Sequence, residues 1–468
     1  MKRPNLPCGM AGTLALAGLL LSLQAQAQVP AATPPIASAQ KPSAATKPQP
    51  VAEFVPHPGL TLSELEQLLL ERDSELQDEL GSVEQARAEQ RGSQLLPNLG
   101  LEAAVGTIPI GPPNPPELTT PLTSIPNYSV GLSLRPDLLR RSAQQKRAAF
   151  LVKAASASLR ASMHERALEL VKVLGELATA QLRVYASHDL REQAQGLLTL
   201  VRSRVDTGYA AGLEADRAEI DLYRVQEQLL AREGEIQASL ASCALLLGMR
   251  CQRFSSEATV RAFLSRWLST AQVAAGPALE SRPDLVAMAA QQSAAEAEVR
   301  LAHAQALPDP TFRFGYTYDS FVISGNQQHS LNVAMSLPLP LFNHGQAEAE
   351  AASSRASRLQ AQRQRKLWST EAQLIALREA LAVQAQRREV LVQKMLPRAR
   401  AMLADLTRAF ELRTLRLTEL LQARTTVDEL LLAEADNLRD SLAAALAIAL
   451  LLPVAETDAS TDRQKGQP

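Results

Sequence analysis

The sequence predicts a mainly α-helical protein with a small β part, and three observations support this fold class. Two very long stretches are dominated by Ala, Leu, Arg, Gln and Glu and contain almost no Pro or Gly, a composition that favours helix. Each stretch follows two short runs in which apolar residues alternate, as they do in strands. The same order occurs in both halves of the chain, so we expect duplicated hairpins of long helices.

The composition excludes several classes of protein. The chain has 468 residues, 48 basic and 49 acidic, and it is 46% hydrophobic but only 4% aromatic. A net charge of -1 argues against a nucleic-acid binder, which would need a basic excess to neutralise phosphates. The apolar content argues against disorder along the whole length. The scarcity of aromatic residues favours an elongated or repeated chain over two or three globular domains.

The N-terminus has the features of a secretory signal. Two basic residues precede an apolar run at 14–23, and an Ala-Gln-Ala triplet follows, so we expect a signal peptide over residues 1–27. The apolar run is short for a retained membrane span, which needs roughly 20 residues. Cys8 precedes the run and is therefore not placed as a lipid-attachment cysteine.

Both ends of the expected mature chain are predicted to be loose. Residues 28–58 are rich in Pro, Ala, Ser and Thr without an apolar period, which indicates a disordered or extended tail. Residues 453–468 are polar and also predicted to be a loose tail. No segment after the signal has 18 uncharged apolar residues, so no membrane-spanning helix is expected.

A duplication organises the rest of the chain. The matching segments are residues 94–97 and 305–308, 131–134 and 334–337, and 213–218 and 418–423, at offsets of 211, 203 and 205. A repeat with so long a period is the simplest account of these matches. We therefore expect a first repeat over 59–248, a linker over 249–276 and a second repeat over 277–452.

Each repeat is expected to open with a helix, at about 62–95 and 282–306, and to continue with two strands. The alternating residues of the strands are Leu99 to Val105, Tyr128 to Leu134, Phe312 to Tyr318, and Leu331 to Leu337. Each run is close to the 9–11 residues of a membrane-crossing strand. An ordinary hairpin of a soluble domain would alternate in the same way, so these runs alone leave both interpretations open.

The longest helices are expected after the strands. The first, at 142–205, would be a rod of roughly 100 Å, and Leu170, Leu174 and Leu177 have heptad-like spacing along it. The second, at 345–412, should be kinked by Pro397. Shorter return helices are expected at 213–247 and 418–452. Because such rods cannot fold around a core of their own, we expect them to pack side by side, across subunits.

Three motifs along this plan resemble outer-membrane efflux proteins of the TolC type, in the metal and multidrug efflux branch. They are Leu279-Glu280-Ser281-Arg282-Pro283-Asp284-Leu285, the strand-to-helix junction from Ser336 to Asn343 with Gly345, and the segments Arg204 to Gly208 and Leu420 to Arg424. The resemblance covers about residues 60–452. One departure is Arg413, where the family usually has Gly, which places the geometry of that turn in doubt.

The resemblance implies a homotrimer in the Gram-negative outer membrane. Each chain would give four strands to a shared 12-stranded β-barrel in lipid, and its hairpins would form a periplasmic α-barrel, with residues 249–276 at the equator. A periplasmic adaptor and an inner-membrane pump, of the resistance-nodulation-division class, would deliver metal ions or small toxic molecules to this passive duct. The alternatives are a type I secretion duct for polypeptides and a periplasmic coiled-coil scaffold without a pore.

Candidate functional residues lie near the ends of the long helices. A gate made of charged rings would use Asp206, Glu214, Asp216, Arg413, Arg416 and Glu419. The alternative is that these charges lie on solvated helix faces. Gly208, Gly212 and Leu213 would form a sharp turn where an adaptor or pump docks, or a plain helix cap.

The remaining reactive residues give weaker signals. Cys243 and Cys251 are compatible with a disulfide, with unpaired thiols or, together with Met249, with a site for a soft cation. The six histidines show no metal-ligand spacing, and no catalytic or phosphate-binding motif is present. We therefore expect no catalytic residue, no cofactor and no bound metal in a protein that is not an enzyme.

Overall fold

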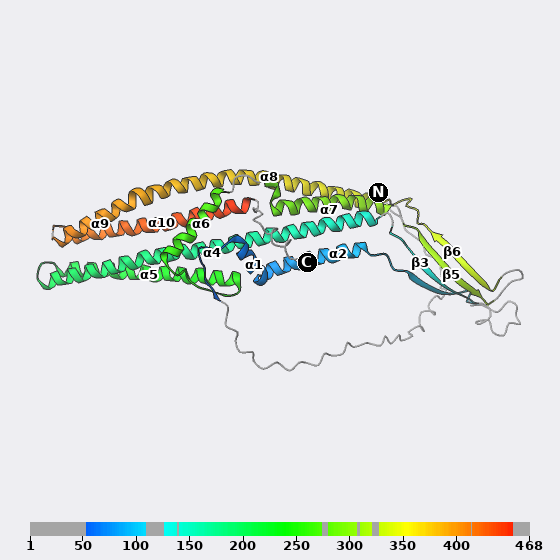
Figure 1. Cartoon of the computed structure of the whole chain (residues 1–468), viewed down its shortest axis with the longest axis horizontal. Helices are drawn as coiled ribbons and strands as arrows, with labels where there is room; N and C mark the ends of the chain where they lie inside the picture. The colour runs from blue at the N-terminus through cyan, green and yellow to red at the C-terminus, as the bar shows by residue number, and fades with distance from the viewer. Residues whose placement is uncertain are drawn as a thin grey trace, which may run out of the picture. The chain divides into compact units, whose positions relative to one another are not determined.

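The computed structural model describes residues 53–108, 126–137, 140–273, 279–306, 309–320, 327–412 and 414–452. The expected signal peptide, most of the N-terminal tail and the C-terminal tail lie outside these residues. The described part belongs to one unit of long helices that run side by side, with a sheet at one end (Figure 1). Within this part of the chain, every helix is too short or too polar to cross a membrane.

Both halves of the chain contain, in order, a helical segment, two strands, a long helical rod and a shorter return helix. The first half contains β1 (Glu53–Phe54), α1 (Leu62–Arg72), α2 (Ser74–Gln94), β2 (Gly100–Gly106), β3 (Asn127–Leu134), α4 (Arg141–Asp206) and α5 (Gly212–Leu247). Between the halves lie β4 (Arg250–Cys251), α6 (Glu257–Val273) and the short 3₁₀ helix η1 (Leu279–Ser281). The second half contains α7 (Pro283–Ala306), β5 (Thr311–Asp319), β6 (His329–Ser336), α8 (Gln346–Glu389), the π-helix η2 (Val390–Met395), α9 (Leu396–Glu411) and α10 (Leu417–Leu451).

The first helix is not continuous, contrary to the prediction. It ends at Arg72, and a new helix starts after Asp73, whose backbone is extended. The Asp73 side chain accepts a hydrogen bond of 2.8 Å from the backbone N–H of Glu75 and so caps α2. Arg166 of α4 lies 3.3 Å from the same carboxylate. A capped and paired Asp therefore breaks a stretch whose composition favours one helix.

The long helix of the second repeat departs from α geometry just before Pro397, as expected from that proline. Six residues, Val390–Met395, form a π-helix, and Pro397 lies at the start of α9. A proline ring clashes with the carbonyl of the residue four positions earlier and removes one backbone hydrogen bond. The widened π-turn accommodates this clash without ending the rod.

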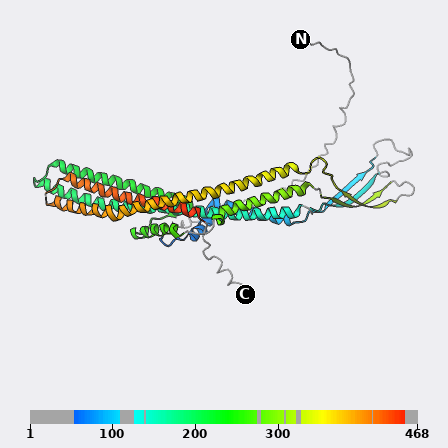
Figure 2. The same ribbon diagram turned by 90° about the horizontal axis from the view of Figure 1, so that it is seen from above.

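The four longer strands form an antiparallel sheet in the order β2-β3-β5-β6. Strands β3 and β5 come from different repeats, so the repeats join in the middle of the sheet, which Figure 2 shows from a second direction. Gly131 and Gly315 lie opposite each other at this junction. A Cβ atom on Gly131 would lie 3.0 Å from the carbonyl oxygen of Phe314 and 3.2 Å from Cα of Gly315. The close approach of β3 and β5 therefore requires glycine there.

Helix α4 is surrounded by elements of its own chain, and a continuous apolar core lies along it. Leu170, Leu174 and Leu177 are fully buried, as their spacing predicts. At Gly175, an added Cβ would lie 2.1 Å from the Leu442 side chain, so α10 packs closely against α4. A single chain thus has a substantial core, which differs from the expectation that these rods depend mainly on packing across subunits.

Residues 53–58, which were expected to belong to the loose tail over 28–58, are described by the structure, and the first two of them form a strand. Glu53–Phe54 pairs in parallel with Arg250–Cys251, and the N–H of Gln252 donates to the carbonyl of Phe54 at 2.9 Å. The segment expected as a linker is also structured, because it contains β4 and helix α6. Phe263 of α6 is fully buried, and the centroid of its ring lies 5.1 Å from the centroid of the Phe254 ring. Aromatic packing, rather than chain flexibility, defines this region.

Candidate functional site

The two helical turns far from the sheet lie together and form one candidate site, the hairpin tip. It comprises the turn between α4 and α5 and the turn between α9 and α10, which lie at the same end of the unit (Figure 1). A shared apolar cluster joins the two hairpins, with Val201 from the first and Phe410, Leu417 and Leu420 from the second. Movement of one tip away from the other would expose this cluster to water.

The turn of the first hairpin depends on Gly208. Its φ is +75°, in the left-handed region that favours glycine. The N–H groups of Gly208 and Tyr209 donate to the carbonyls of Val205 and Arg204, at 2.9 and 2.8 Å. The helix-cap interpretation therefore has direct geometric support. Gly212 begins α5, and Leu213 is 60% exposed and thus accessible to a partner. Docking of an adaptor or pump at this turn stays a prediction.

Five of the six predicted gate residues lie at the hairpin tip. Asp206 ends α4, Glu214 and Asp216 lie at the start of α5, and Arg416 and Glu419 lie at the start of α10. Arg413 lies outside the described residues. Among the residues that are described, none of these five side chains forms an ion pair with another. The structure brings the charges to one end of the chain, and their role as a gate stays a prediction.

Arg204, which the sequence analysis named only as the first residue of a motif and gave no role, links the two tips. Its guanidinium donates to the backbone carbonyls of Phe410 and Glu411, at 2.7 and 3.2 Å. The guanidinium carbon also lies 4.3 Å from the centroid of the Phe410 ring, a cation–π contact. This one side chain therefore satisfies carbonyls at the end of α9 and holds them against α4.

A buried ion pair lies further from the turns, between α5 and α10. Arg424 is 2.8 Å from Asp221, and the two residues are 5% and 7% exposed. Arg424 also donates to the carbonyl of Leu190 in α4 at 2.8 Å, and Arg224 gives Asp221 a second partner at 2.8 Å. Burial lowers the pKa of Arg424, and the nearby Asp221 carboxylate opposes this shift. A second pair, Arg232 with Asp428 at 3.3 Å, joins the same helices.

A charged group of another kind lies on the exposed side of α5. Tyr223 donates a hydrogen bond of 2.9 Å to Glu219, and Arg202 lies 2.8 Å from the same carboxylate. These bonds lower the pKa of Glu219, while the bond to Glu219 raises the pKa of the Tyr223 hydroxyl. The sequence contains a signal for the buried ion pairs, because their charged residues occupy helical positions that are otherwise taken by Ala, Leu and Val. The sequence does not indicate which of these charged residues pair with each other.

A groove of about 1060 Å³ runs beside the tip between α4, α9 and α10. Its walls are largely apolar, with Leu197, Leu403 and Val427 among the lining residues. Charged side chains, including Asp189, Arg400, Arg408 and Glu411, also contribute to the lining. Such a groove has the chemistry to accept an amphipathic helix.

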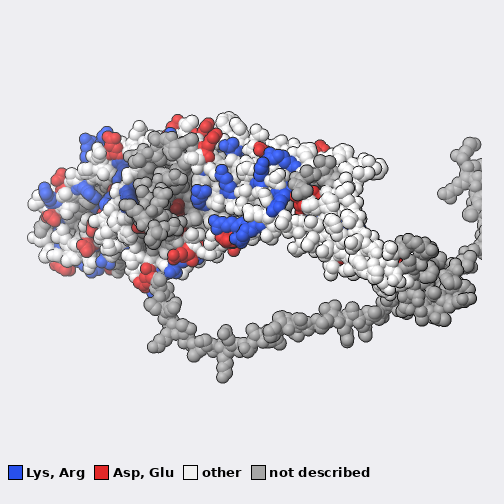
Figure 3. Space-filling model, turned by 45° about the vertical axis from the view of Figure 1, so that its right-hand side comes forward, with Lys and Arg blue, Asp and Glu red and all other residues white. Residues whose placement is uncertain are grey.

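The sheet, the second candidate site, has two chemically different faces. One face is apolar, with rows of opposed residues that include Leu101, Leu132, Phe314 and Val333, and Ala103, Val130, Tyr316 and Leu331. The other face carries Ser, Thr, Asn, Gly and a few charges. Leu331 and Val333 are 84% and 75% exposed. Charged residues are scarce over the sheet and frequent over the helices (Figure 3).

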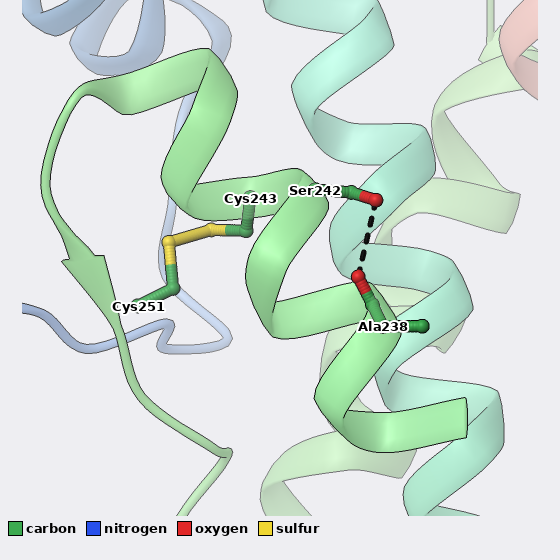
Figure 4. Close-up of a disulfide and its surroundings, with 4 residues drawn as sticks. All are labelled: Ala238, Ser242, Cys243 and Cys251. Carbon is green, nitrogen blue, oxygen red and sulfur yellow. Dashed lines mark hydrogen bonds between the residues drawn. A yellow bond between two sulfur atoms is a disulfide. The ribbon is translucent and has the colours of Figure 1, made fainter. Parts of the chain in front are cut away.

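Cys243 and Cys251 form a disulfide, one of the three alternatives that the sequence left open (Figure 4). Gly248, with φ of +61°, ends α5 and reverses the chain, which brings the two Cα atoms to 6.1 Å. Cys243 is fully buried and Cys251 is 6% exposed. The bond fixes the end of α5 to β4, and thereby to β1.

Metal binding was the third alternative for these cysteines. Within the described ranges, no group of three or more His, Cys, Asp or Glu side chains is arranged to hold a metal ion. The thiols are used in the disulfide and do not serve as ligands.

Comparison with known proteins agrees with this geometry. Residues 275–453 match the family model of the outer membrane efflux protein. A curated relative, the pyoverdine export outer membrane protein OpmQ of Pseudomonas aeruginosa, is 30% identical over 206 residues, which are 42% of this chain and 42% of the relative. The match thus spans less than half the length of that relative.

Solved structures share the fold over most of the chain. The structure of CusC has a TM-score of 0.68 and 16% identity, over 87% of this chain and 99% of CusC. The outer membrane protein VceC of Vibrio cholerae has a TM-score of 0.64 and 18% identity, over 84% of this chain and 96% of VceC. At these identities, the likenesses show a shared fold. Residues 275–453 thus form an outer membrane efflux protein domain, and most of the chain shares the fold of CusC and VceC.

Proposed function

We propose that the protein is the outer-membrane channel of a tripartite efflux system, a passive duct made of three copies of the chain. One observation carries this proposal: a sheet with an exposed apolar face and a polar opposite face continues directly into long helical hairpins. A sheet of this kind in a membrane must close on itself, because unpaired backbone groups are costly in lipid. Four strands from each of three copies would make a closed barrel of 12, with the polar face inside.

The helices supply the second part of the duct. On one face of α8, the side chains of Trp368 and Ile375 are 76% and 61% exposed. The corresponding part of α4 is buried in the same chain. Another copy is the natural cover for this face, because the family likeness and the duplication both indicate that the same helix packing continues around a ring. The hairpins would then form a periplasmic tunnel below the barrel.

The hairpin tip is the proposed gate. Repeated by three-fold symmetry, Asp206, Asp216, Arg416 and Glu419 would form charged rings at the mouth of the tunnel. Opening requires the two hairpins of each chain to move relative to each other, which breaks the contacts of Arg204. The proposed mechanism therefore consists of conduction and gating, with no chemical reaction.

A periplasmic adaptor and an inner-membrane pump, of the resistance-nodulation-division class, are the proposed partners. The turn at Gly208, Gly212 and Leu213 and the groove beside it would receive the adaptor or the pump. The proposed cargo is metal ions or small toxic molecules. The name of OpmQ, which refers to pyoverdine export, supports export over a structural role. A polypeptide duct remains the alternative, because duct walls select weakly.

Fractionation tests the proposal. The full-length protein, produced in a Gram-negative cell, should be extracted from the outer membrane by detergent as a trimer. Recovery as a soluble periplasmic protein would overturn the duct and favour a scaffold without a pore. Deletion strains challenged with metals, dyes and antibiotics would then identify the cargo, and accumulation of an unexported polypeptide would favour the alternative.

A further inference from the structure

Two opposite charges lie close together on the polar face of the sheet. Glu102 of β2 and Arg313 of β5 approach to 3.2 Å, although β3 lies between their strands. Both side chains are about half exposed, at 49% and 54%. Ion pairs this exposed contribute little to stability, so a structural role does not explain the pair well.

Glycine makes the contact possible. In the register of the sheet, Glu102 lies opposite Gly131, and Gly131 lies opposite Gly315. No side chain therefore stands on β3 beside Glu102, and its carboxylate can reach across that strand. The same two glycines allow β3 and β5 to approach closely.

The charges are rare in their surroundings. In the four-stranded sheet of β2, β3, β5 and β6, as the structure describes it, the carboxylates and guanidinium are limited to Glu102, Arg313 and Asp319, the last at the end of β5. The row that contains Glu102 ends at Asn332, which donates a hydrogen bond to Thr317. Neutral polar groups thus surround the pair, so Glu102 and Arg313 determine the electrostatic potential at this part of the polar face.

The duplication relates the two residues. At the offset of 211 that matches Pro97 with Pro308, Glu102 corresponds to Arg313. The same position in the two repeats therefore carries opposite charges. In a closed barrel, β2 of the next copy follows β6, so each Arg313 would have a Glu102 on both sides, one of its own chain and one of a neighbour.

We propose that Glu102 and Arg313 form a ring of alternating charges that keeps the barrel lumen nearly unselective between small anions and cations. This inference rests on the proposed function, because it requires the polar face to line a water-filled pore. Within a chain, Glu102 and Arg313 lie 3.2 Å apart, well inside the Debye length of about 8 Å at physiological ionic strength, so the two charges compensate each other. Loss of either residue leaves a ring of three like charges, which attracts counterions and repels ions of its own sign.

The test is the reversal potential of the purified trimer in a planar lipid bilayer under a KCl gradient. Glu102→Gln should shift the permeability ratio toward chloride by at least about twofold, and Arg313→Gln toward potassium by a similar factor. The double variant should return close to the unmodified protein. Both shifts should shrink at high salt, because mobile ions screen the ring.

The controls separate the possible failures. Asn332→Ala removes a neutral side chain from the same row of the sheet and should leave the ratio unchanged. Trimers on a non-denaturing gel show that each variant has assembled. If the unmodified protein forms no conducting pore, the proposed function fails. If it conducts but the two single variants shift the ratio in the same direction, or not at all, the duct stands and the charged ring is wrong.

Discussion

Helix α4 and its counterpart in the second repeat, which runs from α8 through η2 to α9, have the same length but different surroundings. Both start and end at positions 205 residues apart. Buried residues recur along the whole of α4, whereas those of α8 are Ala349, Ala352, Thr370 and Leu374. The α4 rod is thus completed by its own chain, and the second rod is left open along one side.

Single positions sharpen this comparison. Leu170 of α4 is fully buried, while Ile375, at the same position of the second repeat, is 61% exposed. Apolar side chains of this size cost free energy when they contact water, about 25 cal/mol per Å². The difference teaches that the two repeats share a plan but divide its tasks: the first builds the core of the chain, and the second leaves a face open that another copy would cover in the proposed trimer.

The largest expected effect comes from a charge on the open face. Ile375→Glu should convert the trimer to single chains, because the carboxylate would be buried between copies without a partner. Light scattering of the detergent-extracted protein measures the mass, and far-ultraviolet circular dichroism should still show helix. Ile375→Met, which conserves volume and polarity, should keep the trimer. Intact trimers of the Glu variant would contradict the assignment of this face.

The buried ion pair on the α4 side gives the next effect. Asp221→Asn leaves the Arg424 guanidinium buried without its full counter-charge and should cost about 3–5 kcal/mol of unfolding free energy. Glu219 occupies the position that corresponds to Arg424, but its side chain is 34% exposed and pairs with Arg202 and Tyr223. Glu219→Gln should therefore cost much less, because ion pairs in contact with water contribute little to stability. Denaturant unfolding measures the loss of unfolding free energy in each variant. Equal losses for Asp221→Asn and Glu219→Gln would contradict the difference between the buried and the partly exposed position.

A smaller effect is expected from truncation in the core. Leu170→Ala should reduce stability by about 2–5 kcal/mol, because it removes buried methyl groups and leaves a cavity. Ile375→Ala should reduce it by less, since the chain itself does not bury that side chain. The same unfolding assay compares them. A larger loss for the Ala variant of Ile375 would mean that α8 has packing partners that a single chain does not reveal.

The sequence predicted the long elements well, for physical reasons. Stretches without Pro or Gly favour helix at every position, so the limits of α4 and α5 agree with the expectation to within one residue. The alternation around Leu132 and Phe314 likewise predicted strands with one apolar face. These signals are local, and each residue contributes to them independently.

The parts that sequence reasoning missed depend on distant contacts. Glu53 pairs with Arg250 in strands of two residues, which are too short to leave a periodic signal. Asp73 breaks a helix because it caps the next one, and Arg166, far away in sequence, stabilises that break. At the tip, polar contacts that join the hairpins come from Arg204, whose partners are backbone carbonyls that no sequence pattern marks.

Fluorescence of Trp368 tests the central claim, that another copy covers the open face of the second repeat. The chain has two tryptophans, and Trp267→Phe leaves Trp368, which is 76% exposed in one chain, as the single reporter. In the detergent-extracted trimer, we predict that Trp368 resists quenching by acrylamide, and that Ile375→Glu makes it accessible. Equal and strong quenching in both proteins would contradict the account.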